Sequence, residues 1–308
     1  MVMALLFEAG LGWPGWLYDR IRHPVVWIGA LVSFLDAKLN RESAGDSSRK
    51  LFGVVTMLTV VGVTVAVSTA IALSIPDSLP GHIAEALIAS SLLASRSLYK
   101  HVAAVISPLA AGDLAAARIA VGHIVGRDPA NLDSPAIARA SIESLAENAS
   151  DGVVAPLFWG ALFGLPGIAA YKAINTLDSM IGHRTPRYSS FGWASARTDD
   201  LANFLPARVT ALAFSIAARS LTSFRIACRD AKLHRSPNAG WPESALAGAL
   251  DIRLSGPRIY DGRPTDEPWV NGESADPDHN SIQDGLTLYV GAMILIWLAM
   301  LAIALVLW

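Results

Sequence analysis

Two long stretches without a charged side chain restrict the folds that this sequence can adopt. The first covers 25 residues from Leu51 to Ile75, and the second covers 24 residues from Gly285 to Trp308. Because a helix rises about 1.5 Å per residue, either stretch can cross about 30 Å of hydrocarbon. A buried helix in a large soluble core is the alternative explanation, and it would have to occur twice. The sequence therefore predicts transmembrane helices over 51–75 and 285–308.

The composition agrees with a membrane protein and excludes several other classes. Hydrophobic residues make up 53% of the 308 residues and charged residues 16%, against about 25% in ordinary soluble domains. The 24 Lys and Arg residues nearly balance the 26 Asp and Glu residues, so the net charge of −2 predicts no nucleic-acid partner. The single cysteine, Cys228, excludes an internal disulfide. The beginning of the sequence has no basic segment or cleavage motif that would predict a removable signal peptide.

Three further apolar segments are candidate spans or re-entrant segments. They cover residues 1–35, 82–106 and 152–171. The last segment is uncharged over 20 residues but is broken by prolines and glycines. An irregular backbone at membrane depth needs protein or a water-filled cavity beside it. This broken Gly/Pro-rich segment is therefore expected to form a wall of a site.

The expected fold is an all-α, multi-spanning integral membrane protein, with residues 1–308 forming a single domain. Basic residues precede the 51–75 span, whereas residues 76–84 contain no Lys or Arg. By the positive-inside rule the Leu51 end faces the cytoplasm. The long polar stretch 172–284 then joins it as a large cytoplasmic loop.

A helix is predicted to begin at Ser134, as its N-cap, and to carry three acids on one face. Glu143, Glu147 and Asp151 recur at i, i+4 and i+8 and cover an arc of about 80° at about 100° per residue. A solvated acidic face would explain this spacing, and so would a bound cation that offsets the repulsion. Mg²⁺ bridged to phosphate is the natural cation, because it takes one or two carboxylates and keeps its waters.

Two more polar sets follow the Gly/Pro-rich segment. Asn175 and Asp178 are spaced i, i+3, and Asp199, Asp200 and Asn203 come after them. Two arginines accompany the second set, namely Arg197 and Arg208. Carboxylates and amides can hold a cation while guanidinium groups hold phosphoryl oxygens, so these sets suit a metal-phosphate site. Helix capping and surface ion pairs are the alternative explanation.

Four stretches carry a family resemblance. Residues 143–158, 175–182, 196–203 and 236–243 read ESLAENASDGVVAPLF, NTLDSMIG, ARTDDLAN and SPNAGWPE. They resemble, in the same order, the membrane-bound adenosylcobinamide-phosphate synthases of cobalamin biosynthesis. The similarity extends outside these motifs and covers most of the chain.

The resemblance implies a function. This family condenses adenosylcobyric acid with aminopropanol or its phosphate to form an amide, using ATP and Mg²⁺. The same ligase reaction is expected here, in the inner cell membrane with the active site facing the cytoplasm. The expected partners are corrinoid and amino-alcohol small molecules and membrane lipid, and self-association or association with other cobalamin-pathway enzymes is left open.

The motifs also imply site residues. The catalytic residues would be Glu143, Glu147, Asp151, Arg197 and Asp200. The metal ligands would be Glu147, Asp151, Asp178, Asp199 and Asp200. Substrate or nucleotide would be bound by Asn148, Asn175, Asn203, Arg208, Lys232, Ser236 and Asn238. In the expected mechanism ATP phosphorylates the substrate carboxylate, which gives an acyl phosphate. The amine then attacks this acyl phosphate, and Glu143 is a candidate acceptor for the ammonium proton.

Two other classes of protein fit the same residues. A membrane prenyl or phosphoalcohol transferase also needs Mg²⁺-diphosphate ligands beside apolar helices, but it would not consume ATP. A transporter or a scaffold for the cobalamin pathway would use intramembrane acids to guide ions or substrate. Flux into proteoliposomes without covalent change would identify a transporter.

Overall fold

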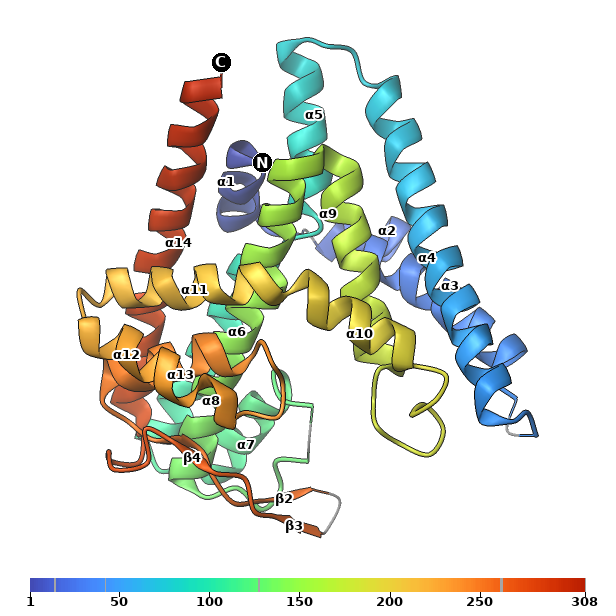
Figure 1. The fold of residues 1–308 in the computed structure, drawn as a ribbon. Helices are drawn as coiled ribbons and strands as arrows, with labels where there is room; N and C mark the ends of the chain where they lie inside the picture. Colours follow the sequence, from blue (N-terminus) through green and yellow to red (C-terminus); the bar gives the residue numbers. More distant parts are fainter. Residues whose placement is uncertain (14, 42, 127, 261–262, 308) are drawn as a thin grey trace. The chain divides into compact units, whose positions relative to one another are not determined.

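The computed structural model describes residues 1–13, 15–41, 43–126, 128–260 and 263–307 of the chain (Figure 1). The described part is mostly helical, with a few short strands. The chain divides into two compact units, each made of two separate segments. Unit 1 comprises residues 1–94 and 155–203, and unit 2 comprises residues 95–154 and 204–308. The expected single domain stays a prediction.

Unit 1 is built around the long helix α4, which packs on α3, α9 and α10. Its apolar core includes Val32, Val60, Leu177 and Phe191, all fully buried. The helices of unit 1 are α1 (Val2–Leu11), α2 (Gly15–Ile21), α3 (Pro24–Leu39), α4 (Asp46–Ser74), α5 (Leu79–Ser90), α9 (Ala155–Ile181) and α10 (Trp193–Ala202).

Helix α9 is interrupted at Gly164, where φ is 65° and ψ is −151°. A side chain is disfavoured at this positive φ, and Pro166 follows in the first turn of the second half, where its missing N–H breaks no helical bond. The two halves then pack closely, because a Cβ on Gly167 would overlap with the carbonyl of Trp159. Figure 1 shows that the chain of α9 reverses its direction between its two halves.

Among the residues that the structure describes, three helical segments are long and apolar enough to cross a membrane. They are Asp46–Ser74, Ser134–Ile181 and His279–Val306. The first and third contain the uncharged stretches 51–75 and 285–308 almost completely, so the prediction of long apolar helices there is confirmed. Trp308, at the end of the second stretch, lies outside the described residues.

A buried polar network fixes the loop between α9 and α10. Arg49 donates from Nε to Asn40 Oδ1 at 3.2 Å and from its terminal nitrogens to the carbonyls of Pro186 and Arg187. Asn40 also donates to Asp36 Oδ1 at 2.8 Å. The Arg187 side chain closes the network by pairing with Asp36 Oδ2 at 2.8 Å. The loop that joins α9 to α10 is therefore held by the end of α3 and the first turn of α4.

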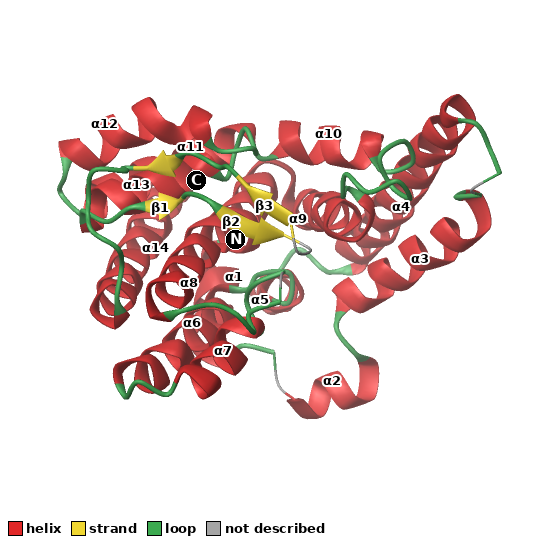
Figure 2. Ribbon diagram, turned by 90° about the horizontal axis from the view of Figure 1, so that it is seen from below, coloured by secondary structure: helices red, strands yellow, loops and turns green. Residues whose placement is uncertain are grey.

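Unit 2 is a helical bundle with two short antiparallel strand pairs. Its helices are α6 (Ser95–Ala110), α7 (Leu114–Gly122), α8 (Ser134–Ala149), α11 (Phe204–Ala217), α12 (Leu221–Asp230), α13 (Gly240–Leu250) and α14 (His279–Leu307), with a π-helical turn η1 (Ser150–Val154) and a 3₁₀ turn η2 (Ala231–Leu233). The strands are β1 (Leu254–Ser255), β2 (Arg258–Tyr260), β3 (Arg263–Thr265) and β4 (Trp269–Val270). β1 pairs with β4 and β2 pairs with β3, and Figure 2 shows both pairs in yellow.

The structure departs from three details of the sequence prediction. The segment 82–106 is not one helix, because α5 ends at Ser90 and α6 begins at Ser95, and the hydroxyl of Ser91 bonds back to the Ile88 carbonyl at the break. The N-cap of α8 is Asp133 and not Ser134, since the Asp133 carboxylate accepts from the Ala136 N–H at 2.9 Å. The strands were not expected in an all-α chain.

Candidate functional site

Five polar side chains of unit 1 form an acidic cluster at the junction of α9 and α10. α9 carries Asn175 and Asp178 one turn apart, and α10 carries Asp199 and Asp200 near its end, with Asn203 as its C-cap. The two helices pack directly against each other. Two polar sets that the sequence predicts separately are thus combined in one unit.

Asp199 lies at the centre of the cluster and is only 9% exposed. Its Oδ2 accepts a hydrogen bond from Asn203 Nδ2 at 3.0 Å. The Asn203 Oδ1 in turn accepts from the Tyr171 hydroxyl at 2.8 Å. The other oxygen, Asp199 Oδ1, is buried and has no hydrogen-bond partner of normal geometry in the described part of the chain. A buried carboxylate oxygen is therefore available for a ligand.

The electrostatics of the cluster favour a positive ligand. The pKa of Asp199 is raised to about 7, first by burial and next by the negative charge of Asp178, against a lowering effect from Asn203. Asp200 adds a smaller increase in this pKa, and Asn175 a smaller decrease. Desolvation and like charges both disfavour the ionised carboxylate, and a bound cation would relieve both.

The residues present fit a magnesium ion that is shared with phosphate. Mg²⁺ takes oxygen ligands and commonly binds only one or two protein carboxylates, with water and phosphate completing its octahedron. Asp178 and Asp199 supply such oxygens, and the unpartnered Asp199 Oδ1 is the observation that supports the fit. Among the described residues, no three His, Cys, Asp or Glu side chains form a group that could hold a metal by themselves. The predicted ligand set stays a prediction.

The position of Asp178 depends on Gly182, one turn further along the chain. The N–H of Gly182 donates to the Asp178 carbonyl at 2.7 Å. A Cβ on Gly182 would overlap with Asp178 Oδ1. The glycine in NTLDSMIG therefore leaves room for the carboxylate that the same motif supplies.

Arg197 lies on the exposed side of α10. Its Nη1 is 3.3 Å from Asp200 Oδ2, and the two side chains are 61% and 33% exposed. An ion pair this exposed contributes little to stability. Both groups can therefore exchange this contact for a ligand at small cost.

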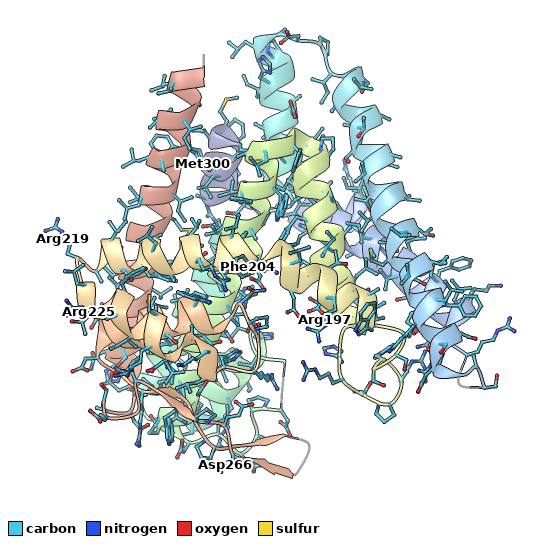
Figure 3. The ribbon with its side chains drawn as sticks, in the orientation of Figure 1. Arg197, Phe204, Arg219, Arg225, Asp266 and Met300 are labelled. Atoms are coloured by element: carbon cyan, nitrogen blue, oxygen red, sulfur yellow. The ribbon has the colours of Figure 1, made fainter. Side chains whose placement is uncertain are left out.

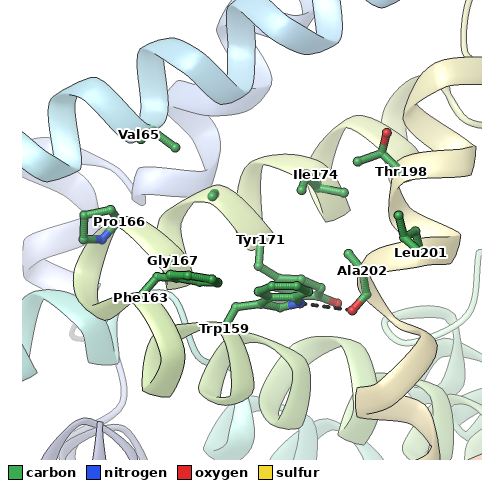
Figure 4. Close-up of a pocket in the computed structure, with 11 residues that line it drawn as sticks. Val65, Trp159, Phe163, Pro166, Gly167, Tyr171, Ile174, Thr198, Leu201 and Ala202 are labelled. Carbon is green, nitrogen blue, oxygen red and sulfur yellow. Dashed lines mark hydrogen bonds between the residues drawn. The ribbon is translucent and has the colours of Figure 1, made fainter.

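An apolar pocket of about 480 Å³ adjoins the acidic cluster (Figure 4). Its lining includes Trp159, Phe163, Tyr171 and Leu201, from both halves of α9 and from α10. The indole of Trp159 donates to the carbonyl of Ala202 at 3.0 Å. Because the Tyr171 ring lines the pocket while its hydroxyl bonds Asn203, one side chain joins the pocket to the cluster.

The predicted acidic face on α8 belongs to unit 2 and is divided by a change of helix type. Glu143 is buried, and its Oε1 accepts from the Ser255 N–H at 2.7 Å. Glu147 and Asn148 are exposed, and the Asn148 amide donates to the Ser144 carbonyl at 2.9 Å. Asp151 lies in the π-helical turn η1, so the α-helical spacing assumed for these acids ends at Ala149.

A second group of polar residues, the loop cluster, is formed in unit 2 by Arg208, His234, Ser236, Asn238 and Glu243. Arg208 donates to Asn238 Oδ1 at 3.3 Å, and its guanidinium stacks on the rings of Phe204 and Trp241. The Ser236 hydroxyl accepts from the backbone N–H of Asn238 and of Ala239. Three of the predicted binding residues are thus joined here, whereas Lys232 is exposed to solvent.

His234 and Glu243 are the buried ionisable residues of the loop cluster. The Ser236 N–H donates to His234 Nδ1 at 3.0 Å, which leaves the proton on Nε2, 3.6 Å from Glu243 Oε1. Burial lowers the pKa of His234, and Arg235 lowers it further. A backbone contact with Ser236 and the charges of Glu143 and Glu267 have the opposite, raising effect on that pKa.

Three residues of these clusters are absent from the predicted site: Tyr171, His234 and Glu243. Glu243 closes the motif SPNAGWPE, so its place in a motif was a usable signal. Tyr171 and His234 have no comparable signal, because their importance follows from burial and from hydrogen bonds to distant residues.

The long apolar helices and the buried carboxylate cluster are those of an all-α membrane protein with a polar site. A sequence model of the CobD/Cbib protein family matches residues 1–289 of the chain. The chain belongs to this family, which is the adenosylcobinamide-phosphate synthase family.

Several curated relatives support the membership. The chain is 56% identical to a cobalamin biosynthesis protein CobD of Rhodobacter capsulatus over 95% of its own length and 93% of the relative. It is 47% identical to the protein of that name from Sinorhizobium sp, over 99% and 98% of the two chains. It is 42% identical to the protein of that name from Brucella suis biovar 1, over 99% and 96%. No solved structure matches the chain significantly. The membership supports a role in cobalamin biosynthesis.

Proposed function

We propose that the chain is an ATP-dependent amide ligase that joins adenosylcobyric acid to aminopropanol or aminopropanol phosphate. The observation that carries this proposal is the buried Asp199 carboxylate, with one free oxygen beside Asp178, in a chain of the synthase family. Such a cluster suits the phosphoryl-transfer half of a ligase reaction. Magnesium bound there would neutralise charge on the phosphates of ATP.

In the first step the corrinoid carboxylate attacks the γ-phosphorus of ATP, so that a P–O bond to ADP breaks and an acyl phosphate forms. Asp199 and Asp178 would hold Mg²⁺, which would supply positive charge to the phosphates of ATP. Arg197, whose exposed pair with Asp200 is easily exchanged, binds phosphoryl oxygens. Asn203 keeps Asp199 in position through its amide.

In the second step the amine nitrogen attacks the acyl carbon and phosphate leaves, which forms the amide. The ammonium proton passes to a carboxylate, for which Glu143 is our candidate. Arg208, Ser236 and Asn238 are proposed as substrate ligands, since the loop cluster offers hydrogen-bonding groups around a stacked guanidinium. The proposed location is the inner cell membrane, with the site on the cytoplasmic side.

The experiment is a reconstitution with defined substrates. The full-length protein in detergent is incubated with adenosylcobyric acid, Mg-ATP and either aminopropanol or its phosphate, and corrinoid mass and ADP are followed. We expect a new amide product with one ADP per product, and the faster amine identifies the acceptor. Product without ADP release would overturn the acyl-phosphate step.

A matched pair of variants tests the acidic cluster. Asp199→Asn should lower turnover by at least about 100-fold, because loss of a group that stabilises phosphoryl charge typically costs this much. It should also abolish any increase in unfolding temperature on addition of Mg²⁺. Asp266→Asn, at an exposed loop residue, should change neither quantity. Normal turnover in Asp199→Asn would remove the cluster from the site.

A prenyl or phosphoalcohol transferase is the second candidate, and the apolar pocket beside the cluster is the observation that favours it. Such an enzyme would turn over isoprenoid or phosphoalcohol donors without ATP. If neither amine gives a product while these donors react, the transferase replaces the ligase. If no donor reacts but corrinoid enters proteoliposomes unchanged, the chain is a transporter.

A further inference from the structure

Helix α11 exposes a continuous apolar stripe. Leu205, Val209, Leu212 and Ile216 are 54%, 40%, 47% and 52% exposed. At about 100° per residue these four positions fall within an arc of about 60° on one face of the helix. The opposite face is buried and includes Ala207, Ala211 and Phe214 in its packing with other helices of unit 2. Exposed apolar residues in such a row mark a surface that contacts something other than water.

The polar groups of α11 are all directed away from the stripe. Arg208 stacks on Trp241 and bonds Asn238, as described above. The Thr210 hydroxyl donates to the Pro206 carbonyl at 2.8 Å, and the Ser215 hydroxyl lies 2.9 Å from that of Ser223. The stripe therefore offers no hydrogen bond to a partner, which favours hydrocarbon as the contacting material.

The depth of α11 can be read from its contacts with α14. Figure 1 shows α11 running across α14 and not along it. The crossing lies at Gly291, where a Cβ would be 3.3 Å from Ala217 Cβ. Gly291 is six residues, or about 9 Å, beyond Gly285, where the uncharged part of α14 begins. In-plane amphipathic helices bury their apolar face about 5–10 Å below the headgroup boundary, so this depth is suitable.

The direction of the stripe follows from α13, which packs on α11, whose buried residues lie opposite the stripe. A Cβ on Gly285 would be 3.6 Å from Leu250 Cδ1, at the end of α13. α13 thus meets α14 at its polar end, and α11 meets it further into the apolar part. The face of α11 that is turned away from α13 looks towards the hydrocarbon.

Basic side chains accompany the apolar surface at the end of α11. Arg219 and Arg225 are exposed, and Leu221 and Phe224 beside them are 75% and 40% exposed. Figure 3 shows Arg219 and Arg225 at the same end of unit 2, where α11 turns into α12. Arginine beside exposed apolar residues is the usual composition of a surface that binds anionic lipid headgroups.

We propose that α11 is an in-plane interfacial helix, which inserts the Leu205–Val209–Leu212–Ile216 stripe into one leaflet while Arg219 and Arg225 bind anionic lipid headgroups. The occupant of this surface is a phospholipid leaflet. The inference does not depend on the catalytic activity of the chain.

Spin labels at single cysteines test the depth. In a Cys228→Ser background the full chain is labelled at Leu212→Cys and, in a separate sample, at Val209→Cys, in phospholipid nanodiscs. Ile303→Cys on the exposed side of α14 serves as the hydrocarbon control and Glu273→Cys as the water control. We expect the stripe labels to be mobile and to collide with oxygen more often than the Glu273 label but less often than the Ile303 label. With a water-soluble nickel reagent, they should collide less often than the Glu273 label but more often than the Ile303 label.

Two outcomes would overturn the depth assignment. Nickel accessibility equal to that of the Glu273 label would place the stripe in water. Immobilised labels that collide with neither reagent would show that protein covers the stripe, for example a second copy of this chain.

The charge component has its own experiment. The variants Arg219→Gln and Arg225→Gln are compared with Arg235→Gln, an exposed arginine of the loop cluster region. Retention of phosphatidylglycerol against phosphatidylcholine is measured by native mass spectrometry. Each of the two substitutions should weaken phosphatidylglycerol retention by about 5-fold, equivalent to about 1 kcal/mol per arginine. Retention equal to that of Arg235→Gln would overturn the headgroup assignment.

Discussion

Tyr171 donates a hydrogen bond of 2.8 Å to Asn203 Oδ1 and thereby fixes which end of the Asn203 amide faces Asp199. With Oδ1 occupied by the phenol, Nδ2 is the group that remains for the carboxylate, and it donates at 3.0 Å. A tyrosine in the apolar helix α9 thus determines the orientation of a group in the acidic cluster.

Substitution Tyr171→Phe should affect turnover more than stability. The lost hydrogen bond leaves a buried amide oxygen unsatisfied, which costs about 1–3 kcal/mol, and frees the amide to rotate away from Asp199. We expect the Mg²⁺ concentration for half-maximal amide formation to rise at least about 3-fold. Tyr289→Phe removes a buried hydroxyl contact with Ser95 and is the matched control for stability. If both variants respond equally to Mg²⁺, Tyr171 has a structural role only.

Substitution Gly182→Ala should displace the Asp178 carboxylate, because the added methyl group would occupy the position of Asp178 Oδ1. We expect turnover to fall at least about 10-fold, because a displacement of about 1 Å in a group of an active site can lower the rate about 100-fold. Gly62→Ala on α4 is the control, because its Cβ would meet no atom within 4 Å. Equal rates in the two variants would contradict a role for the Asp178 position.

Substitution Arg49→Lys should loosen the loop between α9 and α10. Lysine cannot reproduce the forked contacts with Asn40, Pro186 and Arg187, and buried charged hydrogen bonds contribute about 2 kcal/mol. We expect the unfolding temperature in detergent to fall by about 5 °C. Arg41→Lys, at an exposed position, should leave it unchanged. A stable Arg49→Lys variant would show that the network contributes nothing measurable.

The stability of unit 2 should decrease as the pH falls below about 6.5. Burial lowers the pKa of His234 in the folded chain, so the unfolded chain binds a proton at His234 at higher pH than the folded chain does. Protonation then favours unfolding, and the loss grows as pH falls from about 6.5 towards the lowered value. Unfolding temperatures at about pH 7.5 and about pH 5.5, on either side of the ordinary histidine pKa, measure this slope. His234→Asn, which keeps an acceptor for Ser236, should flatten it, whereas His101→Asn at an exposed residue should not.

The long apolar helices and the acids of the cluster could be predicted because each is carried by a local signal. An uncharged run of helical length predicts α4 and α14 directly. The acids in NTLDSMIG and ARTDDLAN could be recognised as motif residues, and the structure brings Asp178, Asp199 and Asp200 together in unit 1.

The remaining features depend on contacts between distant residues. Arg49 contributes to the predicted orientation as one of the basic residues before a span, yet its guanidinium is buried against a loop that lies 137 residues away in the sequence. The π-helical turn after Ala149 changes the angular position of Asp151 around the helix axis, and no residue pattern in the sequence predicts this turn. The break after Ser90 is similar. Serine is tolerated in helices, and here the Ser90 and Ser91 hydroxyls donate to the carbonyls of Leu87 and Ile88, three residues earlier, where the helix ends.

The division of the chain into two units has a consequence for its synthesis. All residues of unit 1 have been made once Asn203 is joined to the chain, whereas unit 2 needs residues 204–308 to complete it. Residues 95–154 are therefore made before α11, α13 and α14, which belong to the same unit. Of these three later helices, α13 and α14 pack on α8. Because chains generally fold in the order of synthesis, α6, α7 and α8 can pack on one another early, whereas their surfaces that contact α13 and α14 stay unpaired until those helices are made. These surfaces are exposed during that interval, which makes this segment the part of the nascent chain most open to wrong contacts.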